Sequence, residues 1–225
     1  MTARPSQDRV VVVGAGPTGL TLANLLGVHG IGVDVLEAGP GLLDYPRAVG
    51  MDDESLRVFQ GAGLVDAVLQ HTGPDHAMRF LGADGRPIAE IAPRTGAYGW
   101  SRRNSFIQPL VDRELLRGLD RFPHVQVHFG VRCTGIEQYG DRVRAHVSGT
   151  RSGVWEASYL VGADGGRSSV RKALGVSFDG TTESTRWLVV DIAGDPLGTP
   201  NVHVGCDPRR PYVSIHLPTA CAGSS

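Results

Sequence analysis

A glycine-rich turn near the N-terminus has the spacing needed to hold phosphate groups. Gly14-Ala15-Gly16-Pro17-Thr18-Gly19 reads GxGxxG. In such a turn the first glycine allows a tight bend, the second leaves room for a pyrophosphate, and the third lets a helix pack closely on a strand. The helix that follows would offer free N–H groups and partial positive charge to the phosphates. We therefore predict a dinucleotide site that includes Val13, Gly14, Gly16, Pro17, Thr18 and Gly19.

A carboxylate lies where a ribose contact would need one. Glu37 comes 18 residues after Gly19, at the end of a second predicted strand, where it can accept hydrogen bonds from ribose hydroxyls. Ala38 follows it and belongs to the same predicted site. A carboxylate would repel a 2′-phosphate, so the site favours FAD or NAD over NADP. The alternative is a turn that only reverses the chain, with Glu37 merely solvated.

A second polar loop, Asp164-Gly165-Gly166-Arg167-Ser168-Ser169-Val170-Arg171, follows another predicted strand. We expect that strand to be buried, so that the Asp164 carboxylate at its end can accept hydrogen bonds from backbone N–H groups and from ribityl or water hydroxyls. The same residues also fit a plain turn at Asp164-Gly165 with Ser168 as the N-cap of a helix. Ser168 can serve as an N-cap under either interpretation.

Short apolar runs predict the elements that position these loops. Arg9–Val13 is β-branched without alternation, which is typical of a strand buried on both faces. A helix over Leu20–Val28 and a strand over Gly32–Glu37 complete a βαβ unit, which should be right-handed. Two short helices are expected between residues 52 and 71, and a longer one over Pro109–Leu119.

The remaining segments predict mainly strands. Ala77–Leu81 and Pro87–Ile91 flank a glycine-containing turn, which predicts a hairpin and the start of a second domain. The turn at Tyr139–Asp141 indicates a meander laid over the main sheet. A short helix is expected over Ser169–Leu174. Further strands are expected at residues 125–127, 130–138, 142–148, 154–161, 186–192, 202–204 and 212–217.

Composition and charge exclude several classes of protein. The 22 basic and 23 acidic residues give a net charge of −1, so no basic excess exists to bind nucleic acid. Cys133, Cys206 and Cys221 are widely spaced, which argues against a disulfide framework or zinc site and favours a reducing cytoplasm. No stretch approaches the roughly 20 apolar residues of a membrane span. We expect a cytoplasmic protein without nucleic-acid or membrane partners, and its oligomeric state stays open.

Five segments together resemble a known enzyme family. They are VVVGAGPTGLTLANLLG, LLDYPRAVGMDDESLRVFQ, FIQPLVDRELL, YLVGADGGRSSVRKALG and RWLVVDIAGDPLGTPNVHVGCDPRRPYVS. The chain resembles the FAD-dependent aromatic hydroxylases of the para-hydroxybenzoate hydroxylase type, and among them it is most similar to the 3-(3-hydroxyphenyl)propionate hydroxylases. The resemblance implies an α/β fold, with a Rossmann-like FAD-binding domain of the glutathione-reductase type and the beginning of a β-sheet substrate domain. The first would comprise residues 1–75 and 107–178, and the second residues 76–106 and 179–225.

The resemblance also implies further cofactor-binding residues. Asp164 and Gly165 belong to the family motif DGxxSxVR, whose loop lies near the FAD pyrophosphate and is linked to NAD(P)H binding. Arg47 matches an arginine near the flavin, and Gln108 matches a glutamine that contacts the ribityl or adenosine part of FAD. Arg132 is a weaker candidate for the same site. Judged from the residues alone, Arg47 and Gln108 could equally be surface polar side chains.

The function implied by the resemblance is a monooxygenase that uses FAD, NAD(P)H as co-substrate and O₂. It would hydroxylate a small phenolic aromatic acid at the carbon ortho to the hydroxyl, and no catalytic acid or base can be named. The family's Gly-Asp-Ala-Ala-His motif is absent, and residues 219–225 show no strand or helix pattern. We therefore expect a chain truncated or frame-shifted inside the second domain. The alternatives are an inactive nucleotide-binding fragment and an NAD-dependent enzyme of unrelated chemistry.

Overall fold

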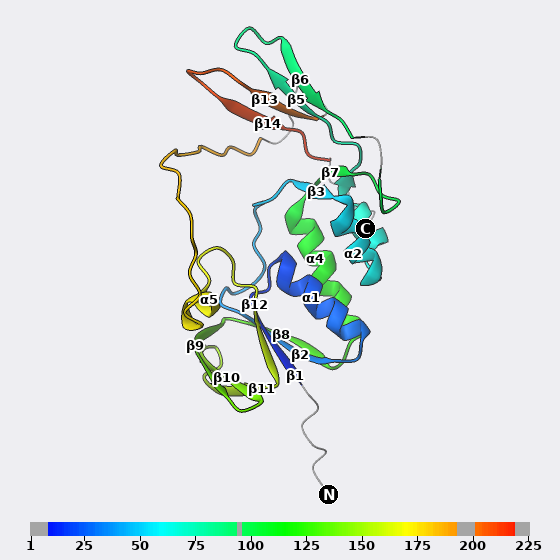
Figure 1. Cartoon of the computed structure of the whole chain (residues 1–225). Helices are drawn as coiled ribbons and strands as arrows, with labels where there is room; N and C mark the ends of the chain where they lie inside the picture. The colour runs from blue at the N-terminus through cyan, green and yellow to red at the C-terminus, as the bar shows by residue number, and fades with distance from the viewer. Residues whose placement is uncertain (1–8, 94–95, 193–200, 219–225) are drawn as a thin grey trace, which may run out of the picture.

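A four-stranded parallel sheet forms one end of the molecule (Figure 1). The computed structural model describes residues 9–93, 96–192 and 201–218. The sheet has the order β12-β1-β2-β8, and its strands are β1 (Arg9–Val13), β2 (Gly32–Glu37), β8 (Val125–Phe129) and β12 (Tyr159–Gly162). Residues 10–13 of β1 are buried, as the β-branched run predicts. Because the four strands are parallel, their carboxyl ends lie along one edge.

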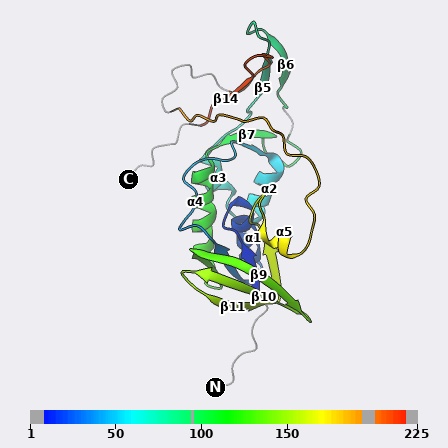
Figure 2. The ribbon, with the colours of Figure 1, turned by 90° about the vertical axis from the view of Figure 1, so that its left-hand side faces the viewer.

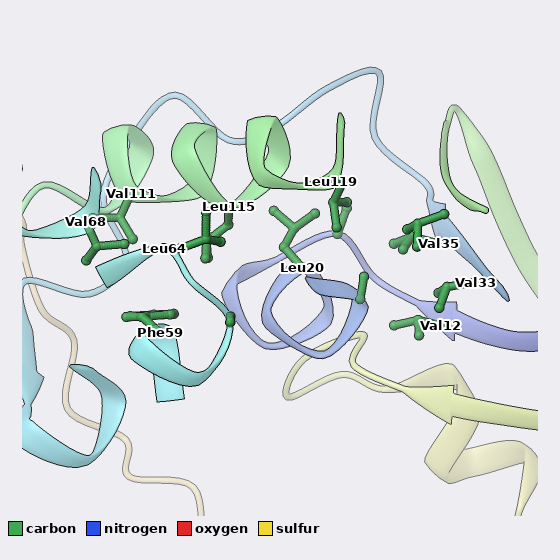
Figure 3. Packing of buried hydrophobic residues seen from close by; sticks show 14 of the residues in the cluster. Val12, Leu20, Val33, Val35, Phe59, Leu64, Val68, Val111, Leu115 and Leu119 are labelled. Carbon is green, nitrogen blue, oxygen red and sulfur yellow. The ribbon is translucent and has the colours of Figure 1, made fainter. Parts of the chain in front are cut away.

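Helices cover one face of this sheet. The layer contains α1 (Pro17–Val28), α2 (Asp53–Gly61), α3 (Val65–Leu69), α4 (Gln108–Gly118) and the 3₁₀ helix η1 (Leu119–Arg121). Figure 3 shows Leu20 of α1 and Leu115 of α4 in the same cluster as Val12 of β1. Fully buried Asn24 ties the two helices together, because its Nδ2 donates to the Leu20 oxygen at 2.9 Å and the Leu115 oxygen at 2.8 Å.

A three-stranded meander covers the opposite face, as predicted (Figure 2). Its strands are β9 (Val131–Tyr139), β10 (Arg142–Gly149) and β11 (Gly153–Ala157). Val11 and Val13 of β1 pack with Val131 and Ala145 of the meander in a second apolar cluster. The segment predicted as a strand at residues 125–127 does not join the meander, because β8 pairs in parallel with β2.

Two further sheets complete the described structure. A four-stranded sheet of order β14-β13-β5-β6 lies at the other end of the molecule (Figure 1). It contains β5 (Met78–Leu81), β6 (Pro87–Ile91), β13 (Val202–Gly205) and β14 (Tyr212–Ile215). The antiparallel pairing of β5 with β6 confirms the predicted hairpin. A small sheet links β3 (Gly50–Asp52), β7 (Arg103–Phe106) and β4 (Thr72–Gly73).

Three predictions about strands are wrong. The segment predicted as a strand at residues 186–192 has no regular structure, and Leu188 is 89% exposed, because no described strand pairs with it. The segment at residues 154–161 is divided at Ser158 between β11 and β12, which belong to different sheets. The strand before Asp164 is not buried, since β12 is an edge strand and Tyr159 is 67% exposed.

The helix boundaries shift slightly from the prediction. α1 already begins at Pro17, where the proline nitrogen needs no hydrogen-bond acceptor. α2 and α3 are the two short helices expected between residues 52 and 71. The short helix near the second polar loop is α5 (Ser169–Ala173). Over residues 9–93, 96–192 and 201–218, no helix is long and apolar enough to span a membrane.

Candidate functional site

The parallel sheet brings the two predicted loops and Glu37 to one edge. Val13, the last residue of β1, pairs with Gly162 of β12 on one side and Leu36 of β2 on the other. Backbone hydrogen bonds extend both pairings past the strand ends. Ala163 N donates to the Val13 oxygen at 2.8 Å, and Gly14 N donates to the Leu36 oxygen at 2.7 Å. The glycine turn therefore lies between Glu37 and the Asp164 loop.

Each glycine of the turn has a different spatial requirement. Gly14 has φ +108°, and a Cβ there would overlap the carbonyl oxygen of Ala163 in the neighbouring loop. A Cβ on Gly19 would overlap the Gly14 carbonyl oxygen, so this glycine permits the helix to pack against the turn. Gly16 differs, because no described atom lies within 4 Å of its virtual Cβ. The open space at Gly16 is where the fingerprint needs room for a pyrophosphate.

The N-terminus of α1 fits an anion. In the described part of the chain, no side chain caps this end and no acidic residue lies in its first turn. Gly16 is the N-cap, and Pro17 and Thr18 are exposed. The first N–H groups of a helix lack intrahelical partners and carry partial positive charge. These features, with the space at Gly16, fit the pyrophosphate of a dinucleotide such as FAD.

Glu37 braces the glycine turn against the end of β2. Its Oε2 accepts from Ala15 N at 2.9 Å, and its Oε1 accepts from Gly39 N at 2.7 Å. The interpretation of Glu37 as merely solvated is therefore wrong. A carboxylate has about four acceptor positions, so each oxygen keeps capacity for a ribose hydroxyl. Ala38 is exposed and lies in the sequence between Glu37 and Gly39, whose N–H group donates a hydrogen bond to Glu37.

The Asp164 carboxylate is engaged by the start of α5. Its Oδ2 accepts from Ser169 N at 2.6 Å, Ser169 Oγ at 2.8 Å and Val170 N at 3.2 Å, and its Oδ1 accepts from the Ser168 hydroxyl. Burial raises the pKa of Asp164, but the hydrogen bonds from Ser168 and Ser169 outweigh it and leave the pKa below its usual value. The carboxylate therefore stays charged at neutral pH.

Ser168 is the N-cap of α5, as one interpretation of this loop predicts. Its Oγ accepts from Arg171 N at 2.9 Å. Next to it, Gly165 has φ +78°, and no described atom lies within 4 Å of a virtual Cβ at Gly165 or Gly166. The part of the loop that a ligand could approach is therefore the glycine backbone, while the Asp164 side chain holds that backbone in place. A direct contact between Asp164 and a cofactor stays a prediction.

Gln108 and Arg47 meet, although they are 61 residues apart. Gln108 Oε1 accepts from Arg47 N at 2.8 Å and from Ala48 N at 2.9 Å. Gln108 is only 5% exposed, so the interpretation of this residue as a surface polar group is wrong. The Arg47 side chain is exposed, and its Nη2 donates to the Tyr45 hydroxyl at 3.3 Å. Contacts of Gln108 and Arg47 with FAD stay predictions.

Arg132 lies on the side of the turn nearest Glu37. It is exposed on β9, two residues after Gly130, whose N–H donates to the Gly39 oxygen at 2.8 Å. The sequence reasoning did not single out Asp112, a buried residue whose Oδ2 accepts from Gln108 Nε2 at 3.2 Å. A signal existed, because Asp112 lies on the helix predicted over Pro109–Leu119 and Gln108 directly precedes it, so a start one residue earlier places the two residues, four positions apart, on one face.

Two hollows lie away from this edge. One of about 760 Å³ lies between the β9–β10 hairpin, β12 and α5, and one of about 360 Å³ adjoins His76 and Arg103. Neither is lined by the glycine turn. Among the residues that the structure describes, no group of three or more His, Cys, Asp and Glu side chains could hold a metal ion. The open edge at Gly16 is therefore the candidate site, as a surface cradle formed by backbone.

Comparison with known proteins agrees with this site. The family model described as "FAD binding domain" matches residues 7–214. The chain is 57% identical over 217 residues to a 3-(3-hydroxy-phenyl)propionate/3-hydroxycinnamic acid hydroxylase of Mycolicibacterium gilvum (strain PYR-GCK), and the match covers 96% of this chain and 38% of that protein. The hydroxylase of the same description from Escherichia coli (strain SMS-3-5 / SECEC) is 52% identical, with 94% and 39% covered. The chain thus spans less than half the length of these relatives.

Solved structures show the same fold. p-Nitrophenol 4-monooxygenase from Pseudomonas putida DLL-E4 superposes with a TM-score of 0.80 at 26% identity, covering 93% of this chain and 55% of that one. Aklavinone-11 hydroxylase, in a ternary complex with FAD and aklavinone, gives a TM-score of 0.65 at 27% identity, covering 77% and 36%. The family match, the hydroxylase relatives and the Rossmann-like parallel sheet agree with one another. The chain belongs to the FAD-binding-domain family and is similar to FAD-dependent aromatic hydroxylases.

Proposed function

We propose that this chain forms the FAD-binding part of an aromatic monooxygenase and that FAD binds at the carboxyl edge of the parallel sheet. The observation that carries the proposal is the meeting of three features there: the uncapped start of α1, Glu37, and the glycine backbone of the Asp164 loop. The N–H groups of α1 would hold the pyrophosphate, and Glu37 the adenosine ribose. Gly165 and Gly166 would face the ribityl side.

The residues of this chain would bind and orient the cofactor. FAD, when bound, supplies hydride acceptance and oxygen activation. The turn at Gly14–Gly19 would fix the position of the pyrophosphate, and the segment at Arg47 would approach the flavin side. We further propose that residues 1–75 and 107–178 form the FAD-binding domain, and that residues 76–106 and 179–225 belong to the substrate domain. β7, at the end of the inserted segment, pairs with β3 and β4 of the first part and so connects the two.

The proposed substrate is a phenolic aromatic acid similar to 3-(3-hydroxyphenyl)propionate, hydroxylated ortho to its hydroxyl with NAD(P)H and O₂. Identities of 52% and 57% to hydroxylases described as acting on this acid support the proposal. The net charge of −1 supports the proposal that no nucleic acid is bound. The three widely spaced cysteines support a cytoplasmic location.

A second candidate is a chain that binds FAD without turning over substrate. The observation that favours it is the segment after α5, which runs along the outside of the molecule (Figure 1). Its apolar side chains Trp187, Leu188 and Ile192 are 69%, 89% and 72% exposed. Apolar side chains in such numbers are normally covered in a working enzyme. NADH oxidation that rises when 3-(3-hydroxyphenyl)propionate is added to the FAD-loaded chain would exclude this candidate.

The FAD site can be tested at Gly16. This residue has an extended backbone (φ −79°, ψ −178°) that valine can adopt, and the space around it is open. Gly16→Val should therefore lower Tm by no more than about 4 °C, from a loss of at most about 1 kcal/mol in N-cap preference. The valine side chain would nevertheless occupy the pyrophosphate position. We expect Gly16→Val to abolish retention of FAD after desalting.

Gly41→Val is the matched control for this experiment. Gly41 lies in the loop after β2, and no described atom lies within 4 Å of its virtual Cβ. Both variants thus add the same side chain to open space. We expect Gly41→Val to retain FAD like the wild type. Equal retention of FAD by wild type and Gly16→Val would place the pyrophosphate elsewhere.

A further inference from the structure

The first turn of α4 contains a chain of buried hydrogen bonds that ends at the loop carrying Arg47. Asp112 Oδ2 accepts from Gln108 Nε2 at 3.2 Å. Gln108 Oε1 in turn accepts from Arg47 N and Ala48 N, at 2.8 and 2.9 Å. Gln108 and Asp112 are 5% and 4% exposed, so solvent cannot replace either partner easily. The carboxylate is thus linked to a loop backbone through one carboxamide.

The orientation of the Gln108 carboxamide follows from these contacts. Two backbone N–H groups converge on one end of the carboxamide, and only its oxygen can accept from both. The NH₂ group must then face Asp112, which offers an acceptor. If the Asp112 acceptor were lost, the NH₂ group would be buried without a partner, which would reduce the preference for this rotamer although the oxygen would still accept from the two backbone N–H groups.

The start of α4 lies at the same end of the helix layer as the start of α1, where the pyrophosphate is proposed to bind. Asn24 donates to the Leu115 oxygen, and Gly27 lies beside Phe122, so the two helices run in the same direction. Gly27 is ten residues after Pro17, and Phe122 is fourteen residues after Gln108. With about 1.5 Å of rise per residue, this offset of four residues places Gln108 roughly 6 Å, about one helical turn, beyond Pro17. The loop held by Gln108 therefore lies roughly one helical turn beyond the start of α1, at the end of the helices where the proposed site lies.

The buried carboxyl group of Asp112 is unfavourable for the stability of the folded protein in two ways. Burial raises the pKa of Asp112 to about 6, and the hydrogen bond from Gln108 offsets only part of the effect. Asp112 Oδ1 is buried without a hydrogen-bond partner among the described residues. A leucine of similar shape would avoid both costs, so a purely apolar packing role does not explain the residue.

We propose that Asp112 is a positioning residue for FAD: it orients the Gln108 carboxamide and, through it, fixes the backbone of Arg47 and Ala48 beside the flavin. This inference rests on the proposed function for its FAD contact. Its structural part, the anchoring of the loop, holds in the free protein. The two parts can therefore be measured separately.

The experiment compares Asp112→Leu, Asp112→Asn and Arg113→Ala in the full chain. Asparagine keeps an oxygen that can accept from Gln108 Nε2, whereas leucine does not. Arg113 is the exposed neighbour on the same helix and serves as the control. The first readout is hydrogen exchange at the amides of Arg47 and Ala48 without FAD. The second is the FAD Kd, measured by quenching of flavin fluorescence.

Loss of one buried hydrogen-bond acceptor changes such equilibria by about tenfold. We expect Asp112→Leu to exchange the two amides about tenfold faster and to bind FAD about tenfold more weakly. Asp112→Asn and Arg113→Ala should stay within about threefold of the wild type in both readouts. If Asp112→Leu does not fold, Asp112→Ala removes the acceptor without added apolar volume and has the same expected results.

The two readouts separate failure of the inference from failure of the proposed function. Exchange at Arg47 and Ala48 that is unchanged in Asp112→Leu or Asp112→Ala would overturn the anchoring role. Faster exchange with an unchanged FAD Kd would overturn the positioning role toward FAD. A wild type that does not bind FAD would instead contradict the proposed function, and the exchange rates would still decide whether Asp112 anchors the loop.

Discussion

Replacing Asp112 by asparagine should stabilise the protein more at pH 8 than at pH 5. Burial raises the pKa of this carboxyl group from 3.8 to about 6 in the folded protein. The folded state therefore binds the proton more tightly than the unfolded state. The stability that this proton contributes is fully present below pH 3.8 and is lost as the pH rises through about 6. Asparagine has no proton to lose, so its contribution is independent of pH.

The size of the effect follows from the shift in pKa. A shift of about two units, at about 1.4 kcal/mol per unit, corresponds to about 3 kcal/mol between very low and high pH. About half of this, roughly 1.4 kcal/mol, falls between pH 5 and pH 8, because Asp112 titrates in the unfolded state below pH 5. The difference in free energy of unfolding between Asp112→Asn and wild type should grow by this amount over that interval.

Urea unfolding at pH 5 and pH 8 measures the difference directly. Comparing variant with wild type at each pH cancels the titration of all other groups. Asp120→Asn is the control, because it removes the same charge from an exposed position at the end of the same helical segment. If the free energy difference between Asp112→Asn and wild type were equal at pH 5 and pH 8, the burial argument for Asp112 would be refuted.

Two further substitutions test residues that support the site, Asn24 between α1 and α4 and Gly14 in the glycine turn. Asn24→Ala removes the hydrogen bonds that link α1 to α4 and to Arg121, so urea unfolding should show a loss of about 2–4 kcal/mol; a loss below about 0.5 kcal/mol would contradict this role. Gly14→Ala places a methyl group against the Ala163 carbonyl at φ +108°. Gly14→Ala should lower the free energy of unfolding by more than about 1 kcal/mol and reduce FAD retention. The control Gly41→Ala should change neither the free energy of unfolding nor FAD retention. Equal effects of Gly14→Ala and Gly41→Ala would exclude a special role for Gly14.

The dinucleotide part of the fold was predictable because its signals are local. The strand at Arg9–Val13, the glycine turn and the strand at Gly32–Glu37 each carry their own pattern, and the structure contains all three. The position of Glu37 next to the turn was predictable too, since parallel neighbouring strands end at one edge. The hydrogen bond from Ala15 to Glu37 confirms that proximity.

The errors arise where the structure depends on partners distant in sequence. Residues 186–192 have strand propensity, yet a strand forms only where a neighbour supplies hydrogen bonds, and none of the described strands does so. The break at Ser158 has the same origin, because β11 pairs with β10 while β12 pairs with β1. Single-residue patterns carry no information about such pairings.

The candidate site was predictable as a set of loops but not as a network. Gln108 is assigned to the cofactor by resemblance, and no pattern indicates that its carboxamide is held by two backbone amides from residues 47 and 48. The prediction that the Asp164 carboxylate accepts from backbone N–H groups is confirmed, but no pattern indicated that these groups belong to the start of α5. The contacts of Gln108 are tertiary contacts, and those of Asp164 are made at a helix start. Both sets form only when the chain folds.

The most direct test of FAD binding at this edge is the visible absorbance spectrum of the purified chain after incubation with FAD and desalting. We predict a retained flavin band with shifted, structured peaks for the wild type, and its absence for Gly16→Val under the same conditions. A colourless wild type that is folded by circular dichroism would contradict the proposal that these residues hold FAD.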